Sequence, residues 1–240
     1  MDRKKVIIVS IMILMILMVC FIVIPKGKVE VEQEPEKIQG IANSIIVRDT
    51  ITKFENSKKS VNVTMPMFQN LESGFESTIN TKIYNDLNDV AVYNKSIEGL
   101  EENEIGKFTY EVTYERINSG KYISIVAQQY IHLGNGRPRI QKKCYVINAE
   151  KNTTAILEDV FASKTRYKAA VLKQINEQAT NSGIELVGGN GLKELSDTQS
   201  FYIKDDKIVI YFEASEIAAT AVGELEFTMP FEMTEEGFII

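Results

Sequence analysis

Residues 108–133 read FTYEVTYERINSGKYISIVAQQYIHL and contain the strongest fold signal in the chain. Apolar and polar side chains alternate in residues 108–115 and again in residues 123–133, which places the apolar ones on one face of an extended strand. Asn118-Ser119-Gly120 separates the two runs with residue types that favour tight turns. The pattern predicts an antiparallel β-hairpin.

Further strands are predicted on both sides of this hairpin. Each is a short run rich in β-branched or aromatic residues and bounded by polar or glycine-containing turns. The runs lie at residues 44–54, 60–67, 139–148, 154–157, 201–203, 207–212 and 224–231.

Two other segments have the periodicity of helices. In residues 71–91 apolar side chains recur every three or four positions, which predicts one amphipathic helix with Asn70 or Ser73 as its N-cap. In residues 167–179 they recur every four positions, and Gly183 supplies a left-handed terminator. The order β-β-α-β-β-β-α-β-β-β predicts an α+β fold, an antiparallel sheet with two amphipathic helices packed on it.

The N-terminal segment has a different character. Residues 6–24 read VIIVSIMILMILMVCFIVI without a charged side chain, and as a helix they would be about 28 Å long, close to the thickness of a bilayer's hydrocarbon core. Pro25 follows where a signal peptide would need small residues before its cleavage site, so an uncleaved transmembrane helix is predicted. A lipoprotein attachment at Cys20 is disfavoured, because Val19 stands where a small residue is needed.

The flanking charges predict the orientation of that helix. Arg3, Lys4 and Lys5 precede it, while Lys26 and Lys28 follow it, so the positive-inside rule favours a cytoplasmic N-terminus. We therefore expect a single-pass protein of the cell membrane with an extracellular C-terminal domain. Its expected parts are a cytoplasmic tail at 1–5, the transmembrane helix at 6–24, a charged flexible tether at 25–43 and an α+β domain at 44–240, with an N-terminal subunit at 44–150 and a C-terminal subunit at 151–240.

Charge and cysteine content narrow the function classes. The net charge is −6, and beyond the membrane segment the chain has more acidic than basic side chains, which disfavours nucleic acid and favours a basic partner. Cys144 is the one cysteine in the predicted domain, so no disulfide can form within it. Because Cys144 lies in a strand-like run, we expect a buried and inert thiol.

Motifs for catalysis are missing from the sequence. His132 is the single histidine, which leaves no histidine pair for a zinc site, and no nucleophile elbow, S-x-x-K, H-E-x-x-H or P-loop motif occurs. Gly188-Gly189-Asn190-Gly191 lacks the Lys-Ser or Lys-Thr pair of a phosphate loop and is interpreted as a flexible loop. No catalytic residue, metal site or cofactor is predicted.

Several segments in the C-terminal half resemble a known family. These are the glycine-rich turn before Pro138, Asp159-Val160-Phe161, IVIYFEASEIA at 208–218 and FTMPF at 227–231. Over about residues 45–235 the chain is similar to the RsiV-like/PdaC-like extracytoplasmic domain family, of DUF3298/DUF4163 type. The family's turn usually reads Gly-Gly-Ala-His-Pro, whereas here residues 134–138 read Gly-Asn-Gly-Arg-Pro. The resemblance implies an outward-facing domain near the cell wall that binds ligands, since the best understood member binds lysozyme.

The leading functional hypothesis is a non-enzymatic binding or sensing module on the membrane of a Gram-positive-type bacterium. Its expected ligand is wall-associated, either a basic protein such as lysozyme or wall glycan. The candidate ligand-binding residues are Tyr130, His132, Asn135, Arg137, Tyr211 and Glu216. Two alternatives stay open: a structural subunit of a membrane complex, and a wall hydrolase using a carboxylate pair, either Glu213 with Glu216 or Asp205 with Asp206.

Overall fold

The computed structural model describes residues 41–96, 98, 106–162, 164 and 166–229. All of them belong to one compact unit, Gln39–Ile240. The predicted tail, the transmembrane helix at 6–24 and most of the tether lie outside the described residues. Among the helices that are described, none has the length and apolar character needed to cross a membrane.

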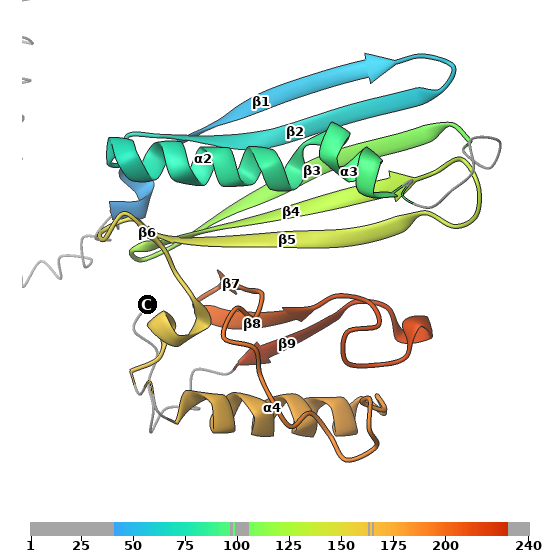
Figure 1. Ribbon diagram of the computed structural model, residues 1–240. Helices are drawn as coiled ribbons and strands as arrows, with labels where there is room; N and C mark the ends of the chain where they lie inside the picture. The colour runs from blue at the N-terminus through green and yellow to red at the C-terminus, as the bar shows by residue number, and fades with distance from the viewer. Residues whose placement is uncertain (1–40, 97, 99–105, 163, 165, 230–240) are drawn as a thin grey trace, which may run out of the picture. The chain divides into compact units, whose positions relative to one another are not determined.

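The N-terminal part of this unit is a six-stranded sheet with the strand order β1-β2-β3-β4-β5-β6 (Figure 1). The hairpin predicted at residues 108–133 is confirmed, because β3 and β4 pair antiparallel from Ser119 and Tyr122 outward. The strands are β1 (Ile46–Glu55), β2 (Lys59–Gln69), β3 (Phe108–Ser119), β4 (Tyr122–His132), β5 (Arg139–Asn148) and β6 (Thr153–Thr154).

The prediction of a purely antiparallel sheet is wrong at one place. β2 and β3 run parallel, with Lys59 opposite Phe108 and Val63 opposite Val112. Between them the chain forms α2 (Ser73–Leu87) and α3 (Asp89–Ser96), and a crossover of this kind returns the chain in its starting direction. The sheet is therefore mixed.

The prediction of a single helix at 71–91 is also wrong, because the helix breaks at Asn88. The backbone of Asn88 is extended (ψ 125°), and its side-chain carbonyl accepts the N–H of Val90 at 2.8 Å, as an N-cap of α3 does. Neither predicted N-cap acts as one, since α2 begins after Glu72 with no side-chain cap. Asn70 instead adopts a positive φ of 68° in the preceding turn.

The C-terminal part forms a sheet of its own, which the sequence pattern did not predict. β7 (Phe201–Lys204), β8 (Lys207–Phe212) and β9 (Leu225–Met229) pair in that order, and α4 (Tyr167–Asn181) contacts β9. Gly183 follows α4 with a φ of 67°, as expected for a terminator. Of the strand predicted at 154–157, only Thr154 lies in a strand, β6. A 3-10 helix (Leu157–Val160) follows.

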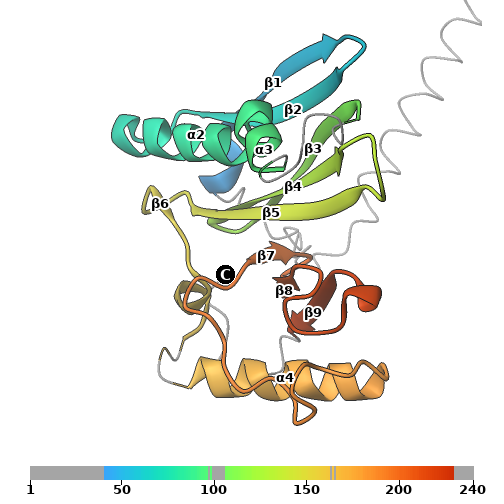
Figure 2. The same ribbon diagram turned by 45° about the vertical axis from the view of Figure 1, so that its right-hand side comes forward.

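The structure has two hydrophobic cores, and the six-stranded sheet contributes to both. Figure 2 shows α2 on one side of this sheet and the three-stranded sheet with α4 on the other. One face of the six-stranded sheet packs with Ile79, Ile83 and Leu87 of α2. Tyr122 and Val146 of the same sheet belong to the second core, with α4 and the three-stranded sheet. The Ile203 N–H donates to the Ser124 hydroxyl at 2.9 Å, which ties β7 to β4. The six-stranded sheet is therefore covered on one face by α2 and is contacted by β7 on the other.

Candidate functional site

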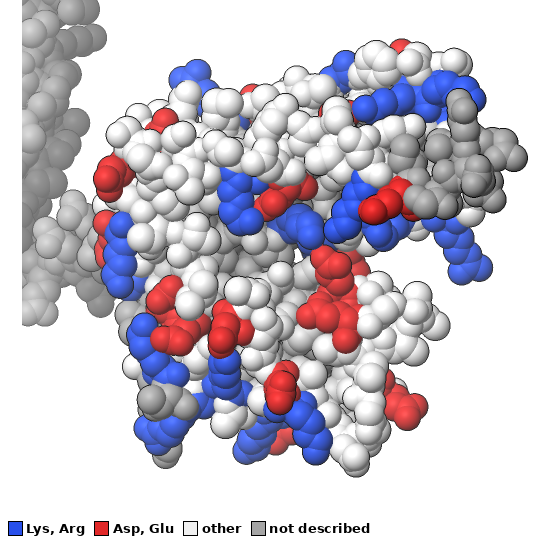
Figure 3. Space-filling model, in the orientation of Figure 1, with Lys and Arg blue, Asp and Glu red and all other residues white. Residues whose placement is uncertain are grey.

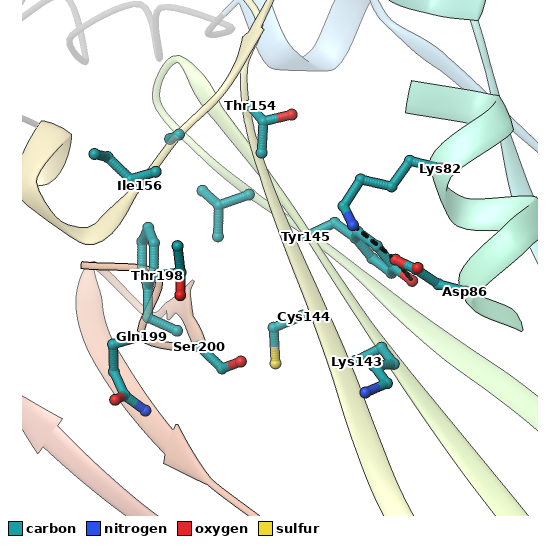
Figure 4. Close-up of a pocket in the computed structure, with 13 residues that line it drawn as sticks. Lys82, Asp86, Lys143, Cys144, Tyr145, Thr154, Ile156, Thr198, Gln199 and Ser200 are labelled. Atoms are coloured by element: carbon teal, nitrogen blue, oxygen red, sulfur yellow. Dashed lines mark hydrogen bonds and ion pairs between the residues drawn. The ribbon is translucent and has the colours of Figure 1, made fainter. Parts of the chain in front are cut away.

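A cavity of about 440 Å³ runs along the outer edge of β5 (Figure 4). α2 forms one wall, and the segment that leads into β7 forms the opposite wall. We call this cavity the β5 groove. The side chains labelled around it are Lys82, Asp86, Lys143, Cys144, Tyr145, Thr154, Ile156, Thr198, Gln199 and Ser200.

The groove exists because β5 lacks a full neighbour on one side. β6 pairs only with Ile147 and Asn148 at the end of β5. Two other contacts mark the same edge: the Lys142 N–H donates to the Tyr211 hydroxyl at 3.1 Å, and the Val146 carbonyl accepts the Ala155 N–H at 2.7 Å. Outward and inward backbone groups alternate along an antiparallel strand. The N–H and C=O of Cys144, midway between these two contacts, therefore face the groove.

The α2 wall presents a charged pair. Lys82 Nζ lies 2.9 Å from Asp86 Oδ2, and the Tyr145 hydroxyl donates to the same carboxylate oxygen at 3.2 Å. Burial and the neighbouring Asp86 raise the pKa of Tyr145 above its ordinary value, so its phenol stays protonated as a donor. Lys82 and Asp86 are partly exposed and present a cation and an anion at the groove, while the buried Tyr145 holds Asp86 in place.

Cys144 lies at the centre of the groove, and Figure 4 shows its side chain and that of Ser200 pointing into the cavity. Its side chain is half-buried, and burial raises the pKa of the thiol to about 12 even though Lys142 lowers it. The reactive form of cysteine is the thiolate. At neutral pH this thiol is therefore protonated, the form of cysteine that is a weak nucleophile.

A second cavity of about 490 Å³ continues the groove, since both are lined by Thr198, Gln199 and Ser200. It reaches Glu213 and Glu216 beyond the end of β8. Lys143 Nζ lies 3.3 Å from Glu213 Oε1, and Lys142 Nζ lies 2.5 Å from Glu226 Oε1. Figure 3 shows basic side chains in a row across the middle of one face, with acidic side chains just below. The lysines of β5 are thus partly neutralised by the C-terminal sheet.

Two of the predicted ligand-binding residues lie near the groove without lining it. Tyr211 is buried, and its hydroxyl accepts the Lys142 N–H and donates to Glu224 at 2.8 Å. Burial raises the pKa of Tyr211 above its ordinary value, so this donor persists at neutral pH. Glu216 lines the second cavity, and its carboxylate accepts the Glu213 N–H at 2.7 Å.

The other four predicted residues belong to the end of the β4–β5 hairpin. Tyr130 and His132 are half-buried on β4, while Asn135 and Arg137 are exposed in the turn. The His132 ring nitrogen Nε2 lies 3.3 Å from the Gly136 carbonyl oxygen. The structure therefore separates these four residues from Tyr211 and Glu216, and none of the six lines the β5 groove.

The carboxylate pairs of the hydrolase hypothesis have structural roles. Asp205 and Asp206 have φ values of 51° and 56°, as the two central residues of a type I′ turn between β7 and β8 do. Glu213 pairs with Lys143, and Glu216 closes the turn after β8. No cluster of three or more metal-ligating side chains occurs among the residues that the structure describes.

Most of the groove-lining residues were not predicted from the sequence. Lys82 and Asp86 are on a helix, and Thr198 and Ser200 come more than one hundred residues later in an irregular segment. Each is an ordinary surface residue type, and no local motif joins them. The available signal was β5 itself, whose following strand is too short to cover it.

Comparisons with known proteins agree with this fold. Residues 158–232 match the family described as "Protein of unknown function (DUF3298)". A crystal structure of a DUF3298 family member from Bacteroides fragilis is 11% identical, with a TM-score of 0.51 over 81% of this chain and 92% of that chain. A DUF3298 family protein from Pseudomonas aeruginosa is 9% identical, with a TM-score of 0.55 over 83% of this chain and 96% of that chain.

At these identities the similarity to solved structures shows a shared fold alone. No curated protein sequence matches the chain. The DUF3298 part of the resemblance is nevertheless confirmed for residues 158–232, and the motif segments 159–161, 208–218 and 227–231 fall within this region, whereas the turn at 134–138 lies outside it. Residues 158–232 of this chain form a DUF3298 domain.

Proposed function

We propose that this protein is a non-catalytic binding module, anchored in a bacterial membrane through residues 6–24 and displaying residues 44–240 on the outer side. Its ligand is a component directed to the cell wall, either a basic protein such as lysozyme or wall glycan. One observation carries the proposal: the β5 groove combines open backbone groups and polar side chains with a cysteine that is protonated at neutral pH.

The lining of the groove supports binding over catalysis. Ligand sites commonly combine a preformed cavity with a few fixed polar groups. Here Asp86 is held by both Lys82 and Tyr145, and Gln199 is held because its side-chain amide donates to the Tyr211 carbonyl at 2.8 Å. Side chains positioned in this way need little reordering when a ligand arrives, which favours affinity.

The charge of the chain favours a basic protein as the partner. The net charge is −6, and long-range attraction steers an oppositely charged partner toward the surface. Glu213 and Glu216 in the second cavity add local negative charge where the groove opens beside β8. The family resemblance to lysozyme-binding domains points to the same class of ligand.

Binding is tested with the purified full-length chain, against lysozyme and against purified cell wall. Ser200→Trp places a large side chain in the groove and is expected to weaken binding at least about tenfold, since it removes the space for the ligand. Ser77→Trp on an exposed position of α2 is the matched control and is expected to bind as the parent does. Failure of the parent chain to bind either ligand would contradict the proposal.

The membrane placement is tested separately on intact cells. External protease is expected to degrade the domain at residues 44–240, because the positive charges before residue 6 hold the N-terminus inside. Digestion of the domain only after the cells are broken would contradict this part of the proposal.

A further inference from the structure

The opposite edge of the six-stranded sheet is formed by β1. One side of this strand pairs with β2 along its whole length, from Ile46 opposite Gln69 to Glu55 opposite Ser60. No described strand pairs with its other side, and Figure 1 shows β1 at the outer margin of the sheet. No residue of β1 is buried, and Ile51 is 58% exposed. An open edge of this length is a template for another strand.

The backbone groups available on this edge follow from one hydrogen bond. The Asn56 N–H donates to the Lys59 carbonyl at 2.8 Å, in register with Glu55 opposite Ser60. Bonding direction alternates along an antiparallel pair, so the even-numbered residues of β1 bond to β2. The odd-numbered residues direct their N–H and C=O groups outward. They are Val47, Asp49, Ile51, Lys53 and Glu55.

We propose that β1 pairs antiparallel with β1 of a second copy of this chain, about a two-fold axis through Ile51. In this register Asp49 lies opposite Lys53 of the second copy, and the symmetry repeats this ion pair. Thr50 then faces Thr52, and Arg48 faces the ring of Phe54. Opposite charges, threonine pairs and cation–aromatic pairs are the side-chain combinations that stabilise neighbouring strands.

Charge selects this register over its neighbours. Moving the axis to Thr50 places Asp49 opposite Ile51 and removes both ion pairs. Moving it to Thr52 places Asp49 opposite Glu55, which juxtaposes like charges twice. A parallel in-register pairing would set Asp49 beside Asp49 and Lys53 beside Lys53. Of these four arrangements, the Ile51-centred antiparallel register is the one that makes the edge complementary to itself, as a two-fold interface requires.

The charged groups are available for this pairing. The Tyr114 hydroxyl donates to Asp49 Oδ1 at 2.5 Å, which orients the carboxylate and leaves its second oxygen to accept from another donor. Lys53 has no ion pair among the described residues. The pairing is independent of the β5 groove, which lies at the other edge of the sheet.

Disulfide trapping tests the register in the full-length chain with Cys20 and Cys144 replaced by Ala. Ile51→Cys places two cysteines directly across the two-fold axis, so mild oxidation is expected to link most of the chains into dimers. Phe54→Cys is the matched control on the same exposed strand, because its copies face Arg48 and are expected to stay unlinked. Linking of Ile51→Cys no faster than that of Phe54→Cys would overturn the proposal.

A charge exchange tests the ion pairs, with the dissociation constant of the dimer measured by sedimentation. Lys53→Asp and Asp49→Lys each set like charges opposite one another and are expected to raise that constant at least about tenfold. The double exchange restores both pairs with reversed sign and is expected to return it to within about threefold of the parent. Circular dichroism checks folding. The proposal would be overturned if the parent chain is monomeric, or if neither single change alters the dissociation constant of the dimer.

Discussion

The two edges of the six-stranded sheet differ in how far other parts of the chain cover their outward backbone groups. At β5, the Tyr211 hydroxyl and the Ala155 N–H form hydrogen bonds with outward backbone groups on either side of Cys144. α2 and the segment before β7 flank this edge. At β1, the outward backbone groups face no described strand, and Ile51 and Phe54 are about half exposed or more.

Under the two proposals, the edges recognise their partners in different ways. Sheet edges are normally protected by charges, by covering segments or by shortness, and β5 has the first two. A short opening between two contacts suits a small segment read by the side chains around it, whereas a ten-residue open strand suits another strand of equal length. If the edges differ as their contacts indicate, substitutions at β5 and at β1 have unequal effects on stability and on side-chain reactivity.

The largest expected contrast is in stability. Tyr145 is 3% exposed and joins the core of the sheet to Asp86, so Tyr145→Ala is expected to lower the free energy of unfolding by about 3–5 kcal/mol. Phe54 on β1 is 48% exposed, and Phe54→Ala is expected to cost less than about 0.5 kcal/mol. Urea unfolding of the parent and of each variant measures both losses. Equal losses would remove the contrast.

The elements of the fold that depend on local pattern were predictable. β5 has the bounds expected from the sequence, because alternation and the turns around it act within ten residues. The break at Asn88 was missed because the apolar periodicity continues through it while its side chain caps the next helix. The parallel pairing of β2 with β3 and the separate C-terminal sheet depend on partners distant in sequence, which periodicity does not report.

The candidate site was less predictable than the fold. Of the predicted residues, Glu216 lines the second cavity and Tyr211 contacts the backbone of β5, but neither lines the β5 groove. Lys82 and Ser200 meet there only because α2 and the segment before β7 flank the same strand edge. No property of either residue in the sequence distinguishes it from other exposed lysines and serines.

The second contrast is in thiol reactivity. Burial raises the pKa of Cys144 to about 12, so at pH 8 it is expected to react with a thiol reagent about 100-fold more slowly than a cysteine placed on β1 by Thr52→Cys. Mass spectrometry of each site against time, in chains with Cys20 replaced, measures the ratio. Comparable rates at pH 8 would show that Cys144 is not shielded.

The same raised pKa gives stability a pH dependence with a defined sign. The folded state favours the neutral thiol, so this contribution is complete below the pKa of an unfolded cysteine, about 9.0, and is lost as the pH rises toward the folded pKa of about 12. Replacing Cys144 with Ala is expected to flatten this part of the stability profile. An unchanged slope between these limits would contradict the assignment to Cys144.

A smaller effect is expected from Tyr211→Phe. The change removes the hydroxyl that accepts the Lys142 N–H and donates to Glu224, and both partners are half-buried. The expected loss is about 1–3 kcal/mol, measured by urea unfolding. Tyr84→Phe on the exposed surface of α2 is the matched control and is expected to be neutral. A neutral Tyr211→Phe would mean that β5 does not need this contact.

The smallest effect concerns the charges beside the β5 edge. Lys143 Nζ lies 3.3 Å from Glu213 Oε1 with both side chains substantially exposed, so Lys143→Met is expected to cost less than about 1 kcal/mol. The loss should shrink further in high salt, because exposed charges are screened. Unfolding at low and high ionic strength measures it, with Lys173→Met on α4, whose ion pair with Glu177 is also exposed, as the control. A loss of unfolding free energy several times larger and unaffected by salt would mean that Lys143 supports the wall of the groove by packing. The β5 edge would then depend on its lysines for shape as well as for charge.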